Sequence, residues 1–427
     1  MLQTIKKKIN GLSQGKKSVL TLVGGTTIAQ GLNFLFSPIQ TRLFSPEVFG
    51  ALSVFTSITG ILSVIVCLRY ELAIVLPKDD DEGFALLKLS FIFAAFVSLF
   101  SLVLFGARSE AIYKLFGASS LQTYWYYVPI TLLLTGLIQA SNYWLTRKRQ
   151  FKVLSYNKVV PVLVLNGVSI SLGFLGNVGL GARLFAVFVS NIANIAILAT
   201  VIIPEFKSNN IRKLYKKTNI ILNYKNFLLY DIWGALINTL SWMIVPILMN
   251  MYYGSAAAGQ YSIGLRVIQI PASLIGAAIT QVFFKNASEK KYEKSLYRYS
   301  LNIIKKLLIY TAPIVIFILL FGKPLFRVVF GNRWEVAGVY SQILAPWALL
   351  WFCASPIHLL FTITQKQSLY FVFSILNLGT RFLSLYLGKL ISSDMWGIAF
   401  FSLSGFIVYG ISMLLALNAA KKSDGLK

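Results

Sequence analysis

Long runs of apolar residues recur along the whole 427-residue chain, and they limit its fold more than any other feature. A helix needs about 20 consecutive apolar residues to cross the hydrocarbon core of a bilayer. Hydrophobic residues make up 56% of the chain and charged residues only 13%, too few to cover a soluble protein of this size. The sequence therefore predicts an all-α integral membrane protein whose apolar excess faces lipid.

Polar breaks divide the apolar runs into twelve expected transmembrane helices. Their approximate cores are residues 18–41, 47–76, 84–106, 122–146, 152–175, 179–203, 226–250, 257–284, 300–321, 336–364, 368–388 and 395–418. The longest polar interruption, at 205–225, is too short to form a core of its own. We expect an N-terminal six-helix bundle at 1–204, a basic cytoplasmic linker at 205–225 and a C-terminal six-helix bundle at 226–427.

Prolines and glutamines at matching places indicate that the two halves are repeats. Pro38 and Pro246 lie near the outer ends of the first and seventh spans. The pairs Pro129 and Pro346, and Gln150 and Gln367, are each 217 residues apart. Many transporters are duplicated bundles with the substrate site between the halves.

The distribution of Lys and Arg predicts the orientation. With both termini inside, 26 basic residues fall on cytoplasmic segments and eight on outer loops, as expected for a protein that follows the positive-inside rule. The first apolar run follows five lysines but lacks a small-residue cleavage site, so we interpret it as a retained span. We expect a multi-pass protein of the bacterial inner membrane.

The net charge of +26 does not indicate nucleic-acid binding, because cytoplasmic loops account for it. Cys67 and Cys353 lie in apolar runs and are interpreted as buried hydrophobes. With one histidine and two cysteines, the sequence predicts no metal site and no cofactor. His358, near the cytoplasmic end of the tenth span, is interpreted as an interface residue rather than as a proton relay.

Ionisable residues inside the spans carry the functional argument. Four basic residues lie deep, each on a different span: Arg69, Lys158, Arg266 and Arg381. Only two acids, Glu71 and Asp231, lie within spans. Charges at such depth are costly and usually face a cavity or a partner. The excess of cations predicts a positively charged cavity for an anionic substrate, in which Arg suits phosphate oxygens.

Two other interpretations of these residues stay open. Each cation can cap a helix end or pair with Glu71 or Asp231. The two carboxylates are also the candidates for proton or sodium coupling, although Asp231 can instead stabilise the start of its helix.

Three stretches resemble the bacterial polysaccharide flippases of the Wzx type. They are residues 38–50 (PIQTRLFSPEVFG), 68–77 (LRYELAIVLP) and 258–266 (AGQYSIGLR), the last followed by Pro271 and the sequence QVFF at 281–284. The flippases belong to the multidrug/oligosaccharidyl-lipid/polysaccharide (MOP) exporter superfamily. Arg42, Glu47, Arg69, Glu71 and Arg266 fall on motif positions, whereas Lys158, Arg381 and Asp231 do not.

The resemblance implies a V-shaped pair of six-helix bundles that alternates between inward-open and outward-open states. Its substrate is expected to be an undecaprenyl-diphosphate-linked oligosaccharide repeat unit of O-antigen or capsule. The expected partners are the lipid bilayer, this glycan, an O-antigen polymerase and a chain-length regulator.

Three other functions compete with this one. A drug/cation antiporter favours an acidic cavity, and a peptidoglycan-precursor flippase often has fourteen spans. An O-antigen polymerase, the enzyme among the alternatives, usually has a large periplasmic loop. Here the longest expected outer loops, near 107–121 and 322–335, have only about 15 residues, so we expect a transporter and not an enzyme.

Overall fold

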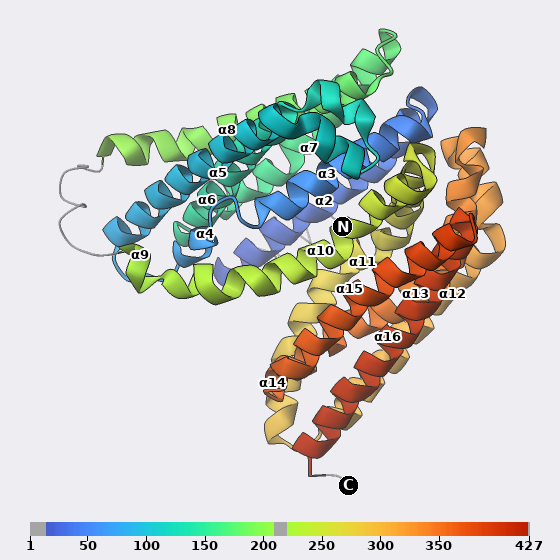
Figure 1. The fold of residues 1–427 in the computed structure, drawn as a ribbon. Helices are drawn as coiled ribbons and strands as arrows, with labels where there is room; N and C mark the ends of the chain where they lie inside the picture. The colour runs from blue at the N-terminus through green and yellow to red at the C-terminus, as the bar shows by residue number, and fades with distance from the viewer. Residues whose placement is uncertain (1–13, 209–219, 426–427) are drawn as a thin grey trace, which may run out of the picture. The chain divides into compact units, whose positions relative to one another are not determined.

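The computed structural model describes residues 14–208 and 220–425, and every regular element in that part is helical (Figure 1). The elements are α2 (Gln14–Leu43), α3 (Pro46–Ser63), α4 (Tyr70–Ala73), α5 (Asp80–Leu115), η1 (Ser119–Tyr124), α6 (Tyr127–Arg147), α7 (Phe151–Phe174), α8 (Leu180–Ser208), α9 (Ile220–Asn223), η3 (Phe227–Asp231), α10 (Ile232–Tyr253), α11 (Ser255–Tyr292), α12 (Leu296–Phe330), η4 (Asn332–Trp334), α13 (Glu335–Ile357), α14 (Leu359–Ile363), α15 (Gln367–Leu390) and α16 (Asp394–Ser423).

Nine helices of the described residues are long and apolar enough to cross a membrane. Three more, α2, α6 and α11, have 30, 21 and 38 residues but a more polar composition. Together these helices overlap, in order, the twelve spans expected from the sequence. The predicted all-α membrane architecture is confirmed.

The polar residues of α2 face another helix. The side chain of Gln40 donates to Asn166 of α7 at 2.6 Å, and Asn166 donates to Asn33 at 3.1 Å. Gln40 and Asn166 are buried. Such amide bonds between helices satisfy polar groups that would be costly in lipid, so the low hydropathy of α2 is compatible with a spanning helix.

Large apolar side chains are exposed along the outer helices. Phe96 and Phe100 of α5 are 65% and 62% exposed, and Ile309 and Leu320 of α12 are 67% and 65% exposed. A soluble monomer rarely exposes apolar surface on this scale. These faces are suited to contact with lipid tails.

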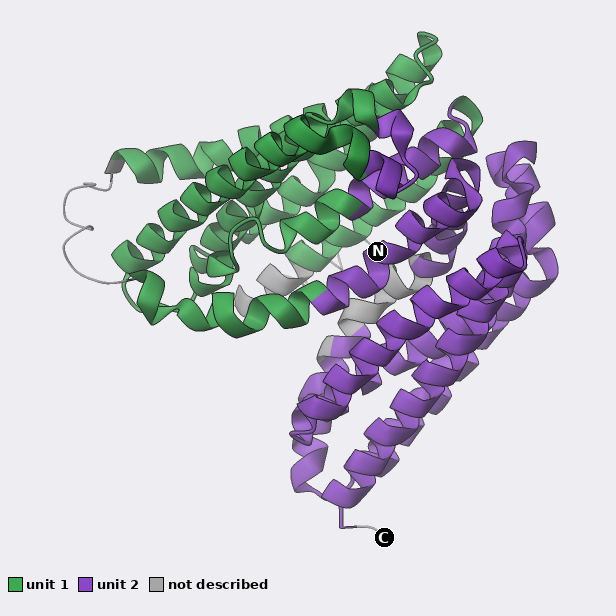
Figure 2. Cartoon of the chain, in the orientation of Figure 1, with its two compact units in different colours: residues 1–43, 58–112, 122–236 green, residues 44–57, 113–121, 237–427 purple. Residues whose placement is uncertain are grey.

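The chain divides into two compact units (Figure 2). Unit 1 comprises residues 1–43, 58–112 and 122–236, and unit 2 comprises 44–57, 113–121 and 237–427. The chain passes between the units more than once, and its last passage falls within α10. The expected assignment of six whole helices to each half stays a prediction.

Within unit 1, α7 packs along both α2 and α8, and α6 packs against α8. Trp144 of α6 is fully buried and its ring lies 5.3 Å from that of Phe84.

Within unit 2, α13 is central and packs against α11, α12 and α16, while α15 pairs with α16. Trp347 of α13 is fully buried and contacts the ring of Phe401 at 5.1 Å.

The second expected span is longer than the helix that the structure forms there. A single helix was expected at 47–76, but α3 ends at Ser63 and only the short helix α4 follows. Leu68 and Arg69 adopt positive φ angles of 51° and 66°, which are incompatible with a right-handed helix. The chain therefore turns where the sequence shows neither glycine nor proline.

Candidate functional site

The left-handed turn at Leu68 and Arg69 places the first group of charged residues. Arg69 occupies the N-cap position of α4 without a side-chain capping bond, and the next residues, Tyr70 and Glu71, are buried. The hydroxyl of Tyr70 donates to the carbonyl oxygen of Ile221 at 2.9 Å and so ties α4 to a distant part of unit 1. Non-glycine residues rarely adopt this conformation, and those that do are often found at functional positions.

Arg69 binds both of the acids that the sequence placed inside spans. Its Nε donates to Asp231 at 2.7 Å, and its Nη1 lies 3.7 Å from an oxygen of Glu71. We refer to Arg69, Glu71 and Asp231 as the unit 1 triad. The structure thus brings together two predicted coupling residues and one predicted substrate ligand.

The environment of the two carboxylates differs. The Glu71 side chain is only 4% exposed and its second oxygen has no hydrogen-bond partner in the described residues, whereas the Asp231 side chain is 45% exposed. Asp231 ends η3, which is a π-helix, a distortion that is frequent at functional sites. One guanidinium faces two carboxylates, so one negative charge is uncompensated within the triad.

Arg147 fixes the connection between α4 and α5. Its Nη1 donates to the carbonyl oxygens of Ile74 and Pro77, at 3.1 and 2.7 Å, and its Nε pairs with Asp80 at 2.8 Å. Lys148 also pairs with Asp80, at 2.7 Å. These bonds hold α4 and the start of α5 in one arrangement.

Arg381 of α15 is buried in the aromatic core of unit 2. It is 2% exposed, and its Nη1 donates to the carbonyl oxygen of Ser241. Its Cζ lies 4.4 Å from the ring centre of Trp242 and 5.5 Å from that of Phe401. Aromatic faces stabilise a cation that is removed from water, so this placement favours a packing role for Arg381.

Lys158 of α7 and Arg266 of α11 are exposed. Arg69 and Lys158 belong to unit 1, and Arg266 and Arg381 belong to unit 2. Lys158 and Arg266 are therefore accessible, whereas Arg69 pairs with acids and Arg381 is enclosed. The common cationic cavity stays a prediction.

Two of the resembled motifs meet within unit 2. Arg42 and Glu47 of the first motif are exposed, at the end of α2 and the start of α3. A Cβ on Gly50 would lie 1.7 Å from the carbonyl oxygen of Ser255, and a Cβ on Gly259 would lie 1.9 Å from that of Pro46. The motif glycines thus allow the backbones of α3 and α11 to touch.

Three buried amides among the described residues of unit 2 were not predicted from the sequence. Asn250 donates to the carbonyl oxygens of Phe116 and Gly117, both at 2.9 Å. Gln260 donates to the carbonyl oxygen of Arg333 at 2.6 Å and accepts from the backbone N–H of Ala337 at 2.9 Å. Asn377, the third, donates to Ser241 at 3.1 Å. Neutral amides carry no charge signal, so a search for charges within spans does not find them.

The surroundings of His358 are mainly aromatic, and its predicted position at an interface stays a prediction. His358 lies between α13 and α14 in an aromatic cluster of unit 2, where its ring centre is 4.8 Å from that of Phe373 and 5.8 Å from that of Tyr409. Its Nε2 forms a hydrogen bond of 2.8 Å with the hydroxyl of Ser412.

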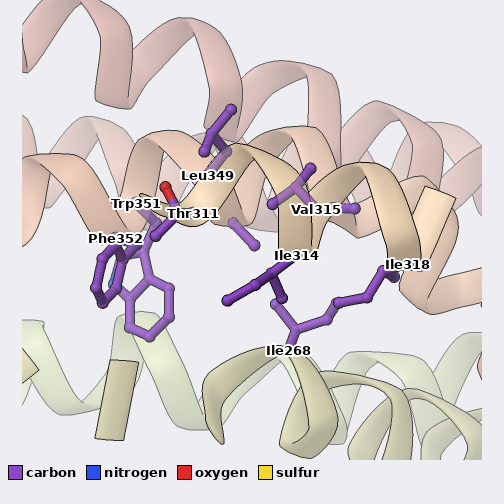
Figure 3. A pocket seen from close by; sticks show the side chains of 10 residues that line it. Ile268, Thr311, Ile314, Val315, Ile318, Leu349, Trp351 and Phe352 are labelled. Carbon is purple, nitrogen blue, oxygen red and sulfur yellow. The ribbon is translucent and has the colours of Figure 1, made fainter. Parts of the chain in front are cut away.

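Unit 2 contains a small apolar crevice between α11, α12 and α13. Its volume is about 30 Å³, and Figure 3 shows Ile268, Ile314 and Trp351 among the side chains around it. It has room for little more than a methyl group. Among the described residues, no group of three or more His, Cys, Asp or Glu side chains is placed to hold a metal ion.

Comparison with known proteins relates this chain to polysaccharide biosynthesis. The profile of the family described as "Polysaccharide biosynthesis protein" matches residues 39–338. The teichuronic acid biosynthesis protein TuaB of Bacillus subtilis (strain 168) is 28% identical over 124 residues, which are 29% of this chain and 26% of that protein. The succinoglycan biosynthesis transport protein ExoT of Rhizobium meliloti (strain 1021) is 23% identical over 343 residues, which are 77% of this chain and 66% of that protein. The matched part spans less than two thirds of either relative.

Solved structures show the same fold. A multidrug resistance MATE family transporter of the MOP superfamily, in an inward-facing conformation, aligns with a TM-score of 0.71 and 15% identity over 92% of this chain and 96% of its own. The lipid II flippase MurJ aligns with a TM-score of 0.75 and 12% identity over 93% of this chain and 87% of its own. The resemblance indicated by the sequence motifs is confirmed: this chain belongs to the polysaccharide biosynthesis protein family, with the fold of the MOP superfamily.

Proposed function

We propose that this protein is a flippase that moves undecaprenyl-diphosphate-linked oligosaccharide repeat units, of O-antigen or capsule, from the cytoplasmic to the periplasmic leaflet by alternating access. The observation that carries this proposal is the family match over residues 39–338 of a chain that has a transporter fold. The names of the two relatives, which refer to teichuronic acid and to succinoglycan transport, agree with a glycan substrate.

The exposed cations are the proposed ligands of the diphosphate. Lys158 and Arg266 are accessible on α7 and α11, and Arg69 is partly accessible beside its two acids. A guanidinium binds phosphate oxygens through two parallel hydrogen bonds, and an ammonium attracts them as a point charge. Arg381 is the least accessible of the predicted ligands.

The unit 1 triad is the proposed site of cation coupling. Its uncompensated negative charge and the nearly enclosed carboxylate of Glu71 favour binding of a proton. Binding or release of that proton changes the charge balance around Arg69 and therefore the position that its side chain prefers. The alternative outcome of a coupling experiment is that sodium, and not a proton, is the coupled ion.

The site of action is proposed to be the inner membrane, with both termini in the cytoplasm, as the 26 to eight distribution of basic residues favours. An O-antigen polymerase and a chain-length regulator are proposed to act on the exported units. The protein itself is proposed to have no catalytic activity.

Proteoliposomes that contain the purified full chain provide the test. They are loaded on one leaflet with an undecaprenyl-diphosphate-linked repeat unit, and a membrane-impermeant glycosidase reports its arrival on the other leaflet. We expect protein-dependent transfer that responds to an imposed pH gradient. Transfer of lipid II or of a cationic drug instead would identify a different MOP transporter, and no transfer of the glycan lipid would refute the proposal.

A further inference from the structure

Unit 2 contains a second cavity, of about 280 Å³, between α10, α13, α14, α15 and α16. Small-molecule sites usually enclose roughly 300–1,000 Å³, so this cavity has room for one ring-sized ligand and not for an oligosaccharide. All of its lining residues belong to unit 2. It is distinct from the apolar crevice in Figure 3, although Trp351 lies in the wall of both.

The walls of the cavity combine aromatic rings with neutral polar groups. Trp242, Trp351, Tyr370 and Tyr409 supply rings, and hydroxyl and amide groups line the same space. Among the described residues that line the cavity, none is Asp, Glu, Lys or Arg. This composition does not suit a metal ion or a lipid tail.

An acceptor atom in the wall is left without a partner. Asn377 is 4% exposed, its amide nitrogen donates to the hydroxyl of Ser241, and its Oδ1 has no hydrogen-bond partner among the described residues. A buried polar atom without a partner costs about 1–3 kcal/mol. A ligand that brings a hydroxyl donor to Asn377 would remove this cost.

Two side chains hold the wall in place, the buried Arg381 and the partly buried His358. Arg381 donates to the carbonyl oxygen of Ser241 and lies against the ring of Trp242, so one guanidinium fixes two lining residues. His358 packs between Phe373 and Tyr409 and bonds to Ser412. The cavity is therefore formed before any ligand arrives.

A sugar ring matches this combination of groups. A pyranose presents an apolar C–H face, which packs on aromatic rings, and a rim of hydroxyls that both donate and accept hydrogen bonds. We propose that the unit 2 cavity binds one sugar ring, with Asn377 as the acceptor for a ring hydroxyl and Trp351 and Tyr370 as packing surfaces. The assignment of this ring to the transported glycan rests on the proposed function, whereas the binding of a sugar does not.

Binding of methyl glycosides to the purified full chain in nanodiscs tests the proposal. The probes are methyl glycosides of common hexoses and N-acetylhexosamines, and the signal is the change in tryptophan fluorescence, to which Trp242 and Trp351 in the cavity wall should contribute. We expect saturable binding of at least one glycoside to the wild type, and binding at least tenfold weaker in Asn377→Leu and in Tyr370→Leu. The second variant changes a partly exposed wall residue and keeps the test usable if the first does not fold. Trp396→Leu, at an exposed tryptophan outside the cavity, is the control and should bind as the wild type does.

Two further measurements separate this proposal from the proposed function. Undecaprenyl phosphate without sugar should not compete with the glycoside, and competition would make the cavity a lipid site and overturn the proposal. Normal flipping of the glycan lipid with no glycoside binding would refute the proposed sugar site and leave the proposed function intact. Glycoside binding without flipping would support the sugar site and refute the proposed function.

Discussion

The backbone of Gly50 lies so close to Ser255 that a Cβ on Gly50 would stand 1.7 Å from the carbonyl oxygen of Ser255. In the reciprocal contact, a Cβ on Gly259 would stand 1.9 Å from the carbonyl oxygen of Pro46. Both obstacles are backbone atoms, which cannot rotate away as a flexible side chain can. Small residues at such crossings allow membrane helices to approach closely, and here they join the two motifs at 38–50 and 258–266.

Replacement of Gly50 by alanine should therefore destabilise unit 2. We expect Gly50→Ala to cost at least about 1–3 kcal/mol, because the contact must open, and to lower the melting temperature of the purified protein. The control is Gly31→Ala in α2, where no heavy atom lies within 4 Å of the added Cβ. There the substitution should be neutral or stabilising, by about 0.5–1 kcal/mol, through higher helix propensity. Equal melting temperatures for both variants would contradict this explanation.

The fold was largely predictable because hydropathy marks spanning helices directly. The positions of most helix ends were less predictable. Arg149 and Lys294 adopt positive φ angles of 55° and 52° just beyond the ends of α6 and α11. The amide nitrogen of the next residue in each case bonds back to the helix, from Gln150 to Leu145 at 2.9 Å and from Ser295 to Lys290 at 3.1 Å. Such endings usually carry glycine, and without it the sequence gives no stop signal.

The charged residues were predictable individually, but their pairing was not. Depth in a span identified Arg69, Glu71 and Asp231, yet Arg69 and Asp231 are 162 residues apart and meet only through the packing of unit 1. For Arg381 the sequence predicted an accessible ligand, whereas the rings of Trp242 and Phe401 enclose it. A one-dimensional count of charges cannot distinguish a cation in a cavity from one that aromatic faces stabilise.

The unit 1 triad should respond to substitutions in a non-additive way. Arg69→Leu leaves the carboxylates of Glu71 and Asp231 without their shared cation, and we expect transport to fall at least tenfold. In the double variant Arg69→Leu/Asp231→Asn only one carboxylate charge remains, so transport should partly recover relative to the single variant. Rates are measured in proteoliposomes at matched protein amounts.

The surface ion pair Lys290–Glu293 provides the comparison for the triad. Exposed pairs of this kind contribute little to stability, so Glu293→Gln should leave the transport rate unchanged. If the effects of the Arg69 and Asp231 substitutions simply add, the two residues act independently and the triad is not a functional unit.

Substitution of the exposed cations should weaken substrate binding while the protein stays folded. We expect Lys158→Ala and Arg266→Ala each to raise the KM for the diphosphate-linked glycan, whereas Arg266→Lys should keep part of the affinity because the charge remains. Lys152→Ala, at another exposed lysine of α7, is the matched control. Wild-type KM in both Arg266 variants, at normal protein level, would show that Arg266 is not a substrate ligand.

Substitution of Arg381 should lower stability before it affects substrate affinity. Arg381→Met removes the hydrogen bond to the carbonyl oxygen of Ser241, and an unsatisfied buried acceptor costs about 1–3 kcal/mol. Arg381→Lys keeps the charge but loses the planar group that lies over Trp242, so it should restore only part of the stability. Melting temperatures and KM are measured on the same preparations, with the exposed Lys306→Met as the control. A raised KM at unchanged melting temperature would contradict the packing role and return Arg381 to the group of direct anion ligands.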